Sequence, residues 1–398
     1  MKILVLAPHP FYQERGTPIA VDLLIRALSE RGDQIDVLTF HEGADRTYPG
    51  VSIHRIRQPL GRLQGVRPGP SFKKLICDVY LFTALIAHLR RQRYDLIHAV
   101  EESAFMAMLM RPFFATPYLY DMDSSMATQI VNRYPVLRPL QGLFRTVEKL
   151  PVRYAEAVVP VCDALAEELP RNRVRYLTVL KDISLLGLEP VDLPPENLRE
   201  QLGIAGSISL YIGNLEPYQG IDLLLASFGV VHPEDTGAHL VIIGGERDEI
   251  ERYESLARRL CIDDRTHFLG KRPLGSMGAY LSQADILLSP RIEGVNTPMK
   301  IYSYLHTGVA VLATRLPTHT QVMTSALAML AEATPSGFAE SWLHLLKDRA
   351  LRQKLGHEAS LFIEREHSYK QFRKTLFELY AHLDHTLPAT PTASEETR

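Results

Sequence analysis

The segment of residues 289–308, SPRIEGVNTPMKIYSYLHTG, combines a helix start with a basic residue. Thr297 and Pro298 are typical of an N-cap and a first helical residue, which predicts a helix from Met299 to His306. Lys300 then falls in the first turn, where the helix dipole disfavours a cation. A lysine at this position therefore indicates a bound anion, and a diphosphate held by the helix N–H groups is the anion that fits best.

The loop before this helix carries Arg291, Glu293 and Asn296. With Lys300 they form a cluster of charged and polar side chains at the end of an expected strand, as a functional site requires. The alternative is a solvated lysine on a surface helix. We favour the binding site because acidic, basic and amide groups share one short loop.

Glycine-containing turns follow other expected strands. Glycine lets a ligand's phosphates approach the backbone, although a plain tight turn is the alternative at each position. The residues concerned are Gly213, Asn214, Gln219 and Gly220 after one strand, Gly244 and Gly245 after the next, and Arg15 and Gly16 after the first strand of the chain.

Acidic residues follow two strands of the first half. His98, Glu101 and Glu102 lie in and after the strand that ends near residue 99, where side chains usually face a ligand. A histidine there is more often a hydrogen-bonded structural residue. The two glutamates are therefore the stronger candidates for ligand binding.

Asp121 and Asp123 flank a methionine directly after another apolar strand. Two carboxylates at this spacing can bind a divalent metal, or act as a base and an electrostatic stabiliser. They can equally cap the next helix. The pattern is common by chance, so we expect no metal here.

Length and composition limit the kind of protein. A chain of 398 residues with 46% hydrophobic and 23% charged residues is expected to form two soluble domains. The net charge of −2 argues against nucleic acid as the main partner. Three widely spaced cysteines, the absence of a signal peptide and the absence of a spanning segment predict a cytoplasmic protein.

Short apolar strands alternate with helical patterns in two series, which predicts two doubly wound α/β domains with parallel sheets. We expect an N-terminal domain at 1–184, a proline-containing linker at 185–206, a second domain at 207–366, a C-terminal helix at 367–384 that packs on the first domain, and a disordered tail at 385–398. The expected strands are Ile3–Ala7, Ile35–Thr39, Asp95–Ala99, Tyr118–Tyr120, Ala157–Val161, Ile208–Ile212, Leu240–Ile243, Thr266–Leu269, Ile286–Ser289 and Val309–Ala313.

The second half resembles the GT-B glycosyltransferases of family four, the glycosyl transferases group 1. The resemblance is continuous over residues 208–323 and looser before them. It rests on the ordered motifs GNLEPYQGIDLL (213–224), LVIIGG (240–245), FLG (268–270), ADILLSPR (284–291), EG (293–294), PMKIYSY (298–304), Gly308 and VLAT (311–314).

This resemblance implies two Rossmann-like domains that face each other across a cleft, with the C-terminal helix crossing back to the N-terminal domain. It implies a nucleotide-sugar donor on the C-terminal domain, an acceptor on the N-terminal domain near Glu101, Glu102 and Asp121, retention of anomeric configuration, and no required cofactor or metal. Lys300 and residues 297–299 then fit the donor diphosphate, and Glu293 fits the sugar. The candidate catalytic residues are Glu293, Asp123 and His98.

The sequence departs from the family pattern at four positions. Asn214 and Gln219 replace an arginine and a lysine, Ser303 replaces the glutamate that binds the ribose, and Asp123 replaces a histidine. Arg15, Arg291, Lys271 and Arg272 are the candidates to supply the missing positive charge. The alternatives are an epimerase-like enzyme on the same fold and a non-catalytic nucleotide-sugar-binding protein.

The acceptor is a glycan, a lipid-linked sugar or a small molecule. Basic residues flank the apolar helix Leu75–Leu89, so the N-terminal domain can rest on the inner face of an anionic membrane. These residues are Arg62, Arg67, Lys73, Lys74, Arg90 and Arg91. A solvated basic rim on a buried helix is the alternative.

Overall fold

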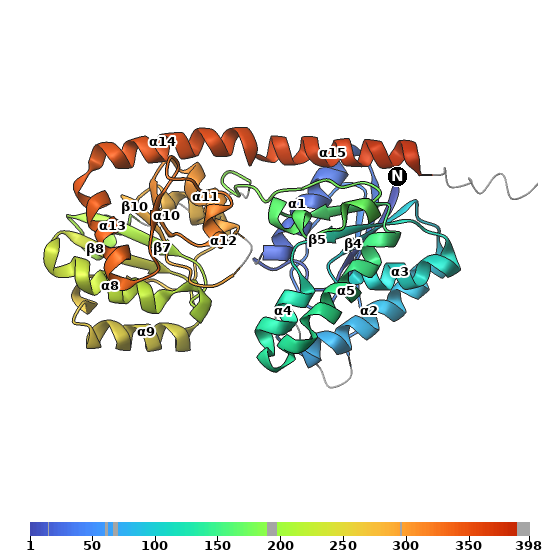
Figure 1. Cartoon of the computed structure of the whole chain (residues 1–398), viewed down its shortest axis with the longest axis horizontal. Helices are drawn as coiled ribbons and strands as arrows, with labels where there is room; N and C mark the ends of the chain where they lie inside the picture. Colours follow the sequence, from blue (N-terminus) through green and yellow to red (C-terminus); the bar gives the residue numbers. More distant parts are fainter. Residues whose placement is uncertain (15, 60–62, 67–70, 189–196, 295–296, 388–398) are drawn as a thin grey trace, which may run out of the picture. The chain divides into compact units, whose positions relative to one another are not determined.

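The computed structural model describes residues 1–398 except 15, 60–62, 67–70, 189–196, 295–296 and 388–398. The chain forms two compact units. Unit 1 comprises residues 1–181 and the segment from residue 372 onward, and unit 2 comprises residues 182–371. Helices cover the sheets of both units (Figure 1).

Unit 1 is built on a six-stranded sheet in the order β3-β2-β1-β4-β5-β6, in which every pair is parallel. The strands are β1 (Lys2–Ala7), β2 (Gln34–Thr39), β3 (Val51–Arg55), β4 (Leu96–Val100), β5 (Tyr118–Met122) and β6 (Ala157–Pro160). The helices are α1 (Gly16–Arg31), α2 (Phe72–Arg91), α3 (Ser103–Phe114), α4 (Met126–Arg133), α5 (Gln141–Tyr154), α6 (Asp163–Glu167) and α15 (Tyr369–Thr386).

Unit 2 repeats this topology in a second parallel sheet of six strands, β12-β11-β10-β7-β8-β9. The strands are β7 (Ser207–Ile212), β8 (Ala238–Ile243), β9 (Thr266–Phe268), β10 (Ile286–Ser289), β11 (Ala310–Thr314) and β12 (Met329–Ala331). The helices are α7 (Leu198–Leu202), α8 (Ile221–Glu234), α9 (Arg247–Arg259), α10 (Met277–Leu281), α11 (Lys300–His306), α12 (Pro317–Thr320), α13 (Pro335–Lys347) and α14 (Arg349–Glu366).

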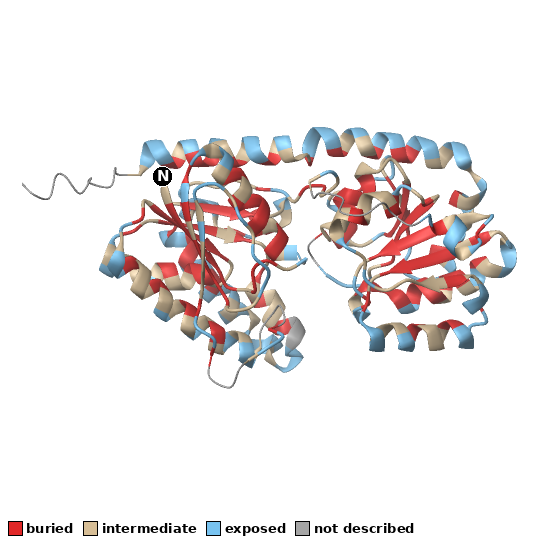
Figure 2. Cartoon of the chain, turned by 180° about the vertical axis from the view of Figure 1, so that it is seen from behind, coloured by how far each residue is buried: buried red, intermediate tan, exposed pale blue. Residues whose placement is uncertain are grey.

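The strands are apolar because each sheet buries both of its faces. Successive residues of β7, Leu210 and Tyr211, belong to different hydrophobic clusters, as the alternation of side chains across a sheet requires. Figure 2 shows the inner strands of both sheets almost wholly buried. The prediction of two doubly wound domains is confirmed.

Every strand that the sequence predicts is present, but β3 and β12 were not predicted. Most side chains of β3 are only half-buried, so its sequence VSIHR lacks the apolar run of an inner strand. The strand β12 has only three residues and is the edge of its sheet. Edge strands carry a weaker pattern because one side and part of one face stay in solvent.

Two helix predictions need correction. Helix α11 begins at Lys300, with Met299 rather than Thr297 at the N-cap. The helix expected to be buried at 75–89 is amphipathic: α2 buries Cys77, Leu81, Leu85 and Leu89, while its first two turns expose Phe72, Leu75 and Val79.

The C-terminal helix α15 contacts the first domain through polar pairs. The hydroxyl of Tyr380 lies 2.8 Å from Nδ1 of His98, and Asp384 pairs with Arg31 at 2.6 Å. Of the predicted linker, residues 189–196 lie outside the described residues, as do residues 388–398 of the tail. No helix in the described part of the chain is long and apolar enough to cross a membrane.

Candidate anion-binding site in unit 2 and acidic site in unit 1

The sheet of unit 2 has its topological switch point between β7 and β10, where ligands bind to open α/β sheets. From there the chain runs towards β8 on one side and towards β11 on the other. The loops that follow β7 and β10 are joined by a hydrogen bond from the N–H of Ile292 to the carbonyl of Tyr218 at 3.0 Å. Residues from both loops therefore converge with the start of α11.

Lys300 is the centre of this convergence. Its Nζ lies 3.9 Å from the centre of the Tyr211 ring and 6.0 Å from that of Tyr304, and it donates to Oε1 of Gln219 at 3.3 Å. Aromatic faces partly compensate a desolvated cation. Burial and the nearby charge of Arg291 hold the pKa of Lys300 well below its ordinary value.

Arg291 is the second cation of the cluster. Its guanidinium lies 5.2 Å from the Tyr218 ring, and its Nε donates to the backbone carbonyl of Glu293 at 2.6 Å. Burial lowers the pKa of Arg291. A Cβ at Gly294 would come within 2.1 Å of the Arg291 guanidinium, so glycine there is needed for the arginine to fold back over the loop.

No carboxylate of the described residues contributes to the shifted pKa of Lys300 or Arg291. Burial without an acidic partner disfavours the charged form of both side chains, and an anion from solution would favour it. The anion site at Lys300 and Arg291 stays a prediction. Lys300 is held by side-chain contacts rather than by a capped helix start.

The side chain of His319 supports the Arg291 loop, and we did not predict this residue from the sequence. Its Nε2 lies 2.8 Å from Oγ of Ser289, and its Nδ1 lies 3.0 Å from Oγ1 of Thr314. Thr314 in turn donates to the carbonyl of Arg291 at 2.5 Å. This buried chain of hydrogen bonds fixes the backbone that carries Arg291. Burial of the ring lowers the pKa of His319 to about 4.

Close packing explains the glycines in the turns that follow β7 and β8. A Cβ at Gly244 would come within 2.0 Å of the carbonyl oxygen of Gly213, so the turns after β7 and β8 touch backbone to backbone. At Gly245 an added Cβ would meet Leu215 at 2.5 Å. These positions need glycine for protein packing. At Gly16, in contrast, an added Cβ would meet nothing within 4 Å, which leaves open space beside the turn.

The corresponding strand ends of unit 1 carry acids instead of cations. Lys74 of α2 pairs with the carboxylate of Glu102 and lies 3.9 Å from Oε2 of Glu101. Asp78, one turn further along α2, is also near, and its Oδ1 is buried with no hydrogen-bond partner among the described residues. Lys74 therefore interacts electrostatically with all three carboxyl groups.

The excess acid changes the protonation of this group. Burial, reinforced by the charge of Glu102, raises the pKa of Asp78 to about 8. Burial also raises the pKa of Glu101, which accepts a hydrogen bond from Ser124 at 2.9 Å. At neutral pH the site is therefore a partly protonated acidic cluster.

His98 is fully buried, and both of its ring nitrogens have partners. Its Nε2 lies 3.0 Å from Oδ2 of Asp121, and its Nδ1 lies 2.8 Å from the hydroxyl of Tyr380. This arrangement matches the structural alternative for a histidine at a strand end, and His98 links β4, β5 and α15. Asp123, expected beside it among the catalytic residues, lies half-buried directly after β5.

Two family models match the chain. "Glycosyl transferases group 1" covers residues 206–348, and "Glycosyl transferase 4-like domain" covers residues 15–179. The chain belongs to the group 1 glycosyltransferases.

Solved structures of this glycosyltransferase fold are similar at low sequence identity. Sucrose-phosphate synthase from Thermosynechococcus elongatus has a TM-score of 0.78 at 20% identity, over 96% of this chain and 99% of that one. HepE from Anabaena, in complex with UDP, has 0.73 at 16% over 96% and 100%. WaaG, involved in lipopolysaccharide biosynthesis, has 0.69 at 13% over 94% and 98%. No curated protein matches the sequence. The prediction of a GT-B fold is confirmed.

Two of the four departures of this glycosyltransferase from the family pattern, Asn214 and Gln219, lie in the cation cluster. Gln219 is buried and bonded to Lys300, and Asn214 places its Nδ2 3.4 Å from the hydroxyl of Tyr218. Tyr211 completes the cluster by donating to the carbonyl of Asn214 at 2.7 Å. We did not predict Tyr211 or Tyr218 from the sequence. Tyr218 lies within the glycine motif 213–224, and Tyr211 lies two residues before it.

Of the four basic residues expected to supply the missing charge in this glycosyltransferase, only Arg291 is seen in the cluster. Lys271 pairs with Glu246 at the surface of unit 2. Arg272 donates to the carbonyl of Leu269 at 2.6 Å. Arg15 lies outside the described residues.

The remaining predicted donor residues are placed around α11. Thr297 is buried, and its hydroxyl has no hydrogen-bond partner among the described residues. Ser303 is also buried, and its hydroxyl accepts a hydrogen bond from the N–H of Leu185 at 3.1 Å. Glu293 is exposed, and Asn296 lies outside the described residues. Asp121 and Asp123 belong to no group of described residues that could share a metal ion.

Proposed function

We propose that this protein is a retaining glycosyltransferase of the hexosyltransferase type. It moves a sugar from a nucleotide-diphosphate sugar to a glycan, a lipid-linked sugar or a small-molecule acceptor. The observation that carries this proposal is the pair Lys300 and Arg291, two desolvated cations at the β7–β10 switch point with no carboxylate partner among the described residues.

The leaving group of such a transfer is a nucleoside diphosphate, on which negative charge grows as the glycosidic bond breaks. Lys300 and Arg291 stabilise that charge more strongly than water would, because they are already in place and desolvated. Gly213 leaves the room that this requires, since a Cβ there would lie 3.0 Å from Nζ of Lys300. The buried hydroxyl of Thr297 adds a donor beside the start of α11.

Glu293 is the carboxylate that we assign to the donor sugar, where it accepts hydrogen bonds from sugar hydroxyls. The fold relatives support a nucleotide donor, since HepE has been observed with UDP and with UDP-glucose. We further propose that the transfer requires no metal or other cofactor, because Lys300 and Arg291 neutralise the diphosphate themselves.

We assign the acceptor to unit 1. Glu101, Glu102 and Asp121 offer carboxylate oxygens that can accept hydrogen bonds from the hydroxyls of an acceptor sugar. Asp123 is the candidate to take or relay the acceptor's proton. His98 then acts as a positioning residue, because it holds Asp121 at 3.0 Å and is itself buried.

We also propose that unit 1 rests on an anionic membrane surface at the cytoplasmic side. On α5 the exposed residues Leu143, Val147, Leu150 and Tyr154 follow helical spacing, so they form one apolar stripe. Exposed basic residues alternate with them in the sequence and form a second stripe on the neighbouring flank of the helix: Arg145, Lys149 and Arg153. Such a face combines insertion into lipid with attraction to anionic headgroups.

The exposed start of α2 adds to this surface, with Phe72 at 77% and Leu75 at 59% relative exposure. Lys73 is exposed beside them, whereas Lys74 is engaged by Glu102. Co-sedimentation with vesicles of anionic and of zwitterionic lipid tests the contact. We expect binding to anionic vesicles that the double variant Leu143→Glu, Val147→Glu abolishes; equal binding by this variant would contradict it.

A panel of UDP-, GDP- and ADP-linked sugars tests the donor. We expect at least one to raise the melting temperature of the wild type and not that of Lys300→Ala, and we expect product with retained anomeric configuration by NMR when an acceptor is present. Loss of the sugar nucleotide without acceptor would instead indicate an epimerase-like enzyme. Binding without turnover on any acceptor would indicate a non-catalytic binding protein.

A further inference from the structure

Three potential metal ligands converge in unit 1 from elements that are far apart in the sequence. Asp36 lies on β2, His54 on β3 and His88 in the last turn of α2. One ligand atom of each lies within 4.8 Å of the other two. Nε2 of His54 is 2.9 Å from Oδ1 of Asp36, and the two imidazole rings are 4.7 Å apart at their centres.

The chemistry of this group suits a transition metal of the zinc class. Two imidazoles and one carboxylate form a common three-residue set for Zn²⁺, with water in the fourth position. Donor atoms around a tetrahedral Zn²⁺ lie about 3.4 Å apart, since each is about 2.1 Å from the ion. Small side-chain rotations therefore bring the three ligands to binding distance.

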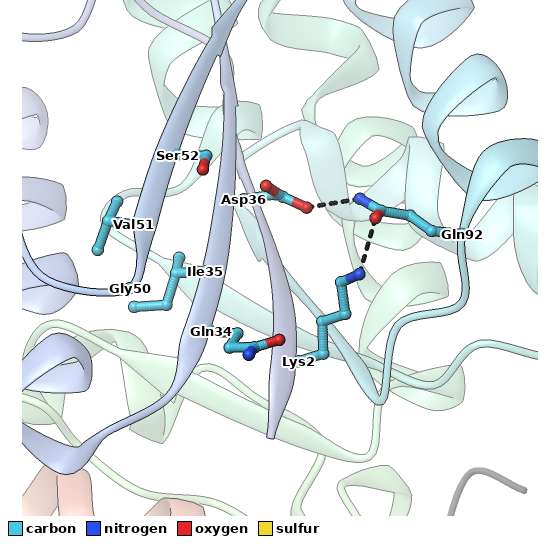
Figure 3. Close-up of a pocket in the computed structure, with 8 residues that line it drawn as sticks. All are labelled: Lys2, Gln34, Ile35, Asp36, Gly50, Val51, Ser52 and Gln92. Atoms are coloured by element: carbon cyan, nitrogen blue, oxygen red, sulfur yellow. Dashed lines mark hydrogen bonds between the residues drawn. The ribbon is translucent and has the colours of Figure 1, made fainter. Parts of the chain in front are cut away.

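Neighbouring groups hold Asp36 in the orientation that a metal ligand needs. Its Oδ2 accepts hydrogen bonds from the hydroxyl of Tyr94 at 2.8 Å and from Nε2 of Gln92 at 2.6 Å. Figure 3 shows Gln92 between Asp36 and Lys2, to which its Oε1 is also bonded at 2.7 Å. Oδ1 remains directed at His54. Such outer hydrogen bonds orient the ligands of metal sites.

An entry route to the three ligands exists. Asp36 and Gln92 line a cavity of 430 Å³, and 39% of the His54 side chain is exposed.

We propose that Asp36, His54 and His88 bind one divalent ion of the zinc class, which ties β2, β3 and α2 together. The ion would hold these elements together rather than act in the transfer reaction. His88 lies about 21 Å along α2 from Lys74, at 1.5 Å per residue, and is thus remote from the acidic strand ends. The ion would strengthen the attachment of the half-buried strand β3 to the rest of unit 1.

The experiment is a titration of the full chain with ZnCl₂ in competition with a chromogenic chelator, on a Cys261→Ser background because that thiol is exposed. We expect one equivalent to bind. We expect His88→Gln and His54→Gln to weaken it at least 100-fold, and Tyr94→Phe to weaken it about tenfold through the orientation of Asp36. Bound Co²⁺ should give the visible absorption of a tetrahedral site, which both histidine variants lose.

The matched control is His239→Gln. His239 and His267 of unit 2 form another close imidazole pair, with ring nitrogens 3.1 Å apart. The loss of His239 should leave zinc affinity unchanged. The variants' circular dichroism shows whether they fold. Zinc affinity that is unaffected by His88→Gln, or the absence of stoichiometric binding by the wild type, would overturn the proposal and leave a hydrogen-bonded cluster only.

Discussion

The two units share one topology and differ in the charge at their switch points. In unit 2, Lys300 and Arg291 have no described carboxylate to pair with, whereas in unit 1 a single Lys74 serves Asp78, Glu101 and Glu102. The fold alone does not determine this, because both sheets have the same strand order. This difference is the basis of our proposal that unit 2 binds the donor's diphosphate and unit 1 the acceptor's hydroxyl groups.

Removal of the central cation of unit 2 should have the largest effect. We expect Lys300→Ala to lower kcat/KM by about 10²–10³-fold, because the charge that develops on the leaving diphosphate loses a preorganised partner. Steady-state kinetics against donor concentration measures this. The control is Lys271→Ala, a lysine of the same unit that pairs with Glu246 at the surface. Equal losses in both variants would contradict a specific anion site.

Removal of the cation of unit 1 should instead destabilise the fold. Lys74→Met leaves three carboxyl groups without their partner, which should lower the free energy of unfolding of unit 1 by about 3 kcal/mol. Urea unfolding followed by circular dichroism measures it. Trp342, the single tryptophan, is buried in unit 2, so its fluorescence reports that unit separately. The exposed Lys73→Met is the control, and an equal loss there would refute the cluster.

The acidic cluster should also make unit 1 sensitive to pH. Because folding raises the pKa of Asp78 from 3.8 to about 8, the folded protein binds an extra proton between those values. Its free energy of unfolding therefore falls as the pH rises through this window. Asp78→Asn should reduce that slope and stabilise unit 1 by about 2 kcal/mol above pH 8. Melting curves from pH 5 to 9 test it, with the exposed Asp45→Asn as control.

Added positive charge in unit 2 should give the smallest effect. Gln219→Lys places a second ammonium group beside Lys300, and we expect donor affinity to rise about fivefold, close to 1 kcal/mol. Gln219→Met, which removes the amide without adding charge, should not increase affinity. Calorimetric titration of the donor compares the two variants. A weaker donor complex in Gln219→Lys would show that the diphosphate lies elsewhere.

The sequence predicted the fold, and it selected Lys300 and Arg291 as candidates for an anion site, because both follow from local patterns. Apolar strands between helices predict a doubly wound sheet. Lys300 is unusual at a helix start because the helix dipole disfavours a cation in the first turn. The contacts of Tyr211, Gln219 and His319 could not be predicted, because they depend on how separate loops pack. Lys74 and Asp78 were also missed as parts of the acidic cluster, since they are far in sequence from Glu101 and Glu102.

The measurement that tests the charge comparison most directly is calorimetric titration of UDP, GDP and ADP, each beside its nucleoside, into the wild type and Lys300→Ala. We predict that one diphosphate binds the wild type at least tenfold more tightly than its nucleoside, and that Lys300→Ala removes this difference. Equal affinity for diphosphate and nucleoside, or an undiminished preference in Lys300→Ala, would contradict the account.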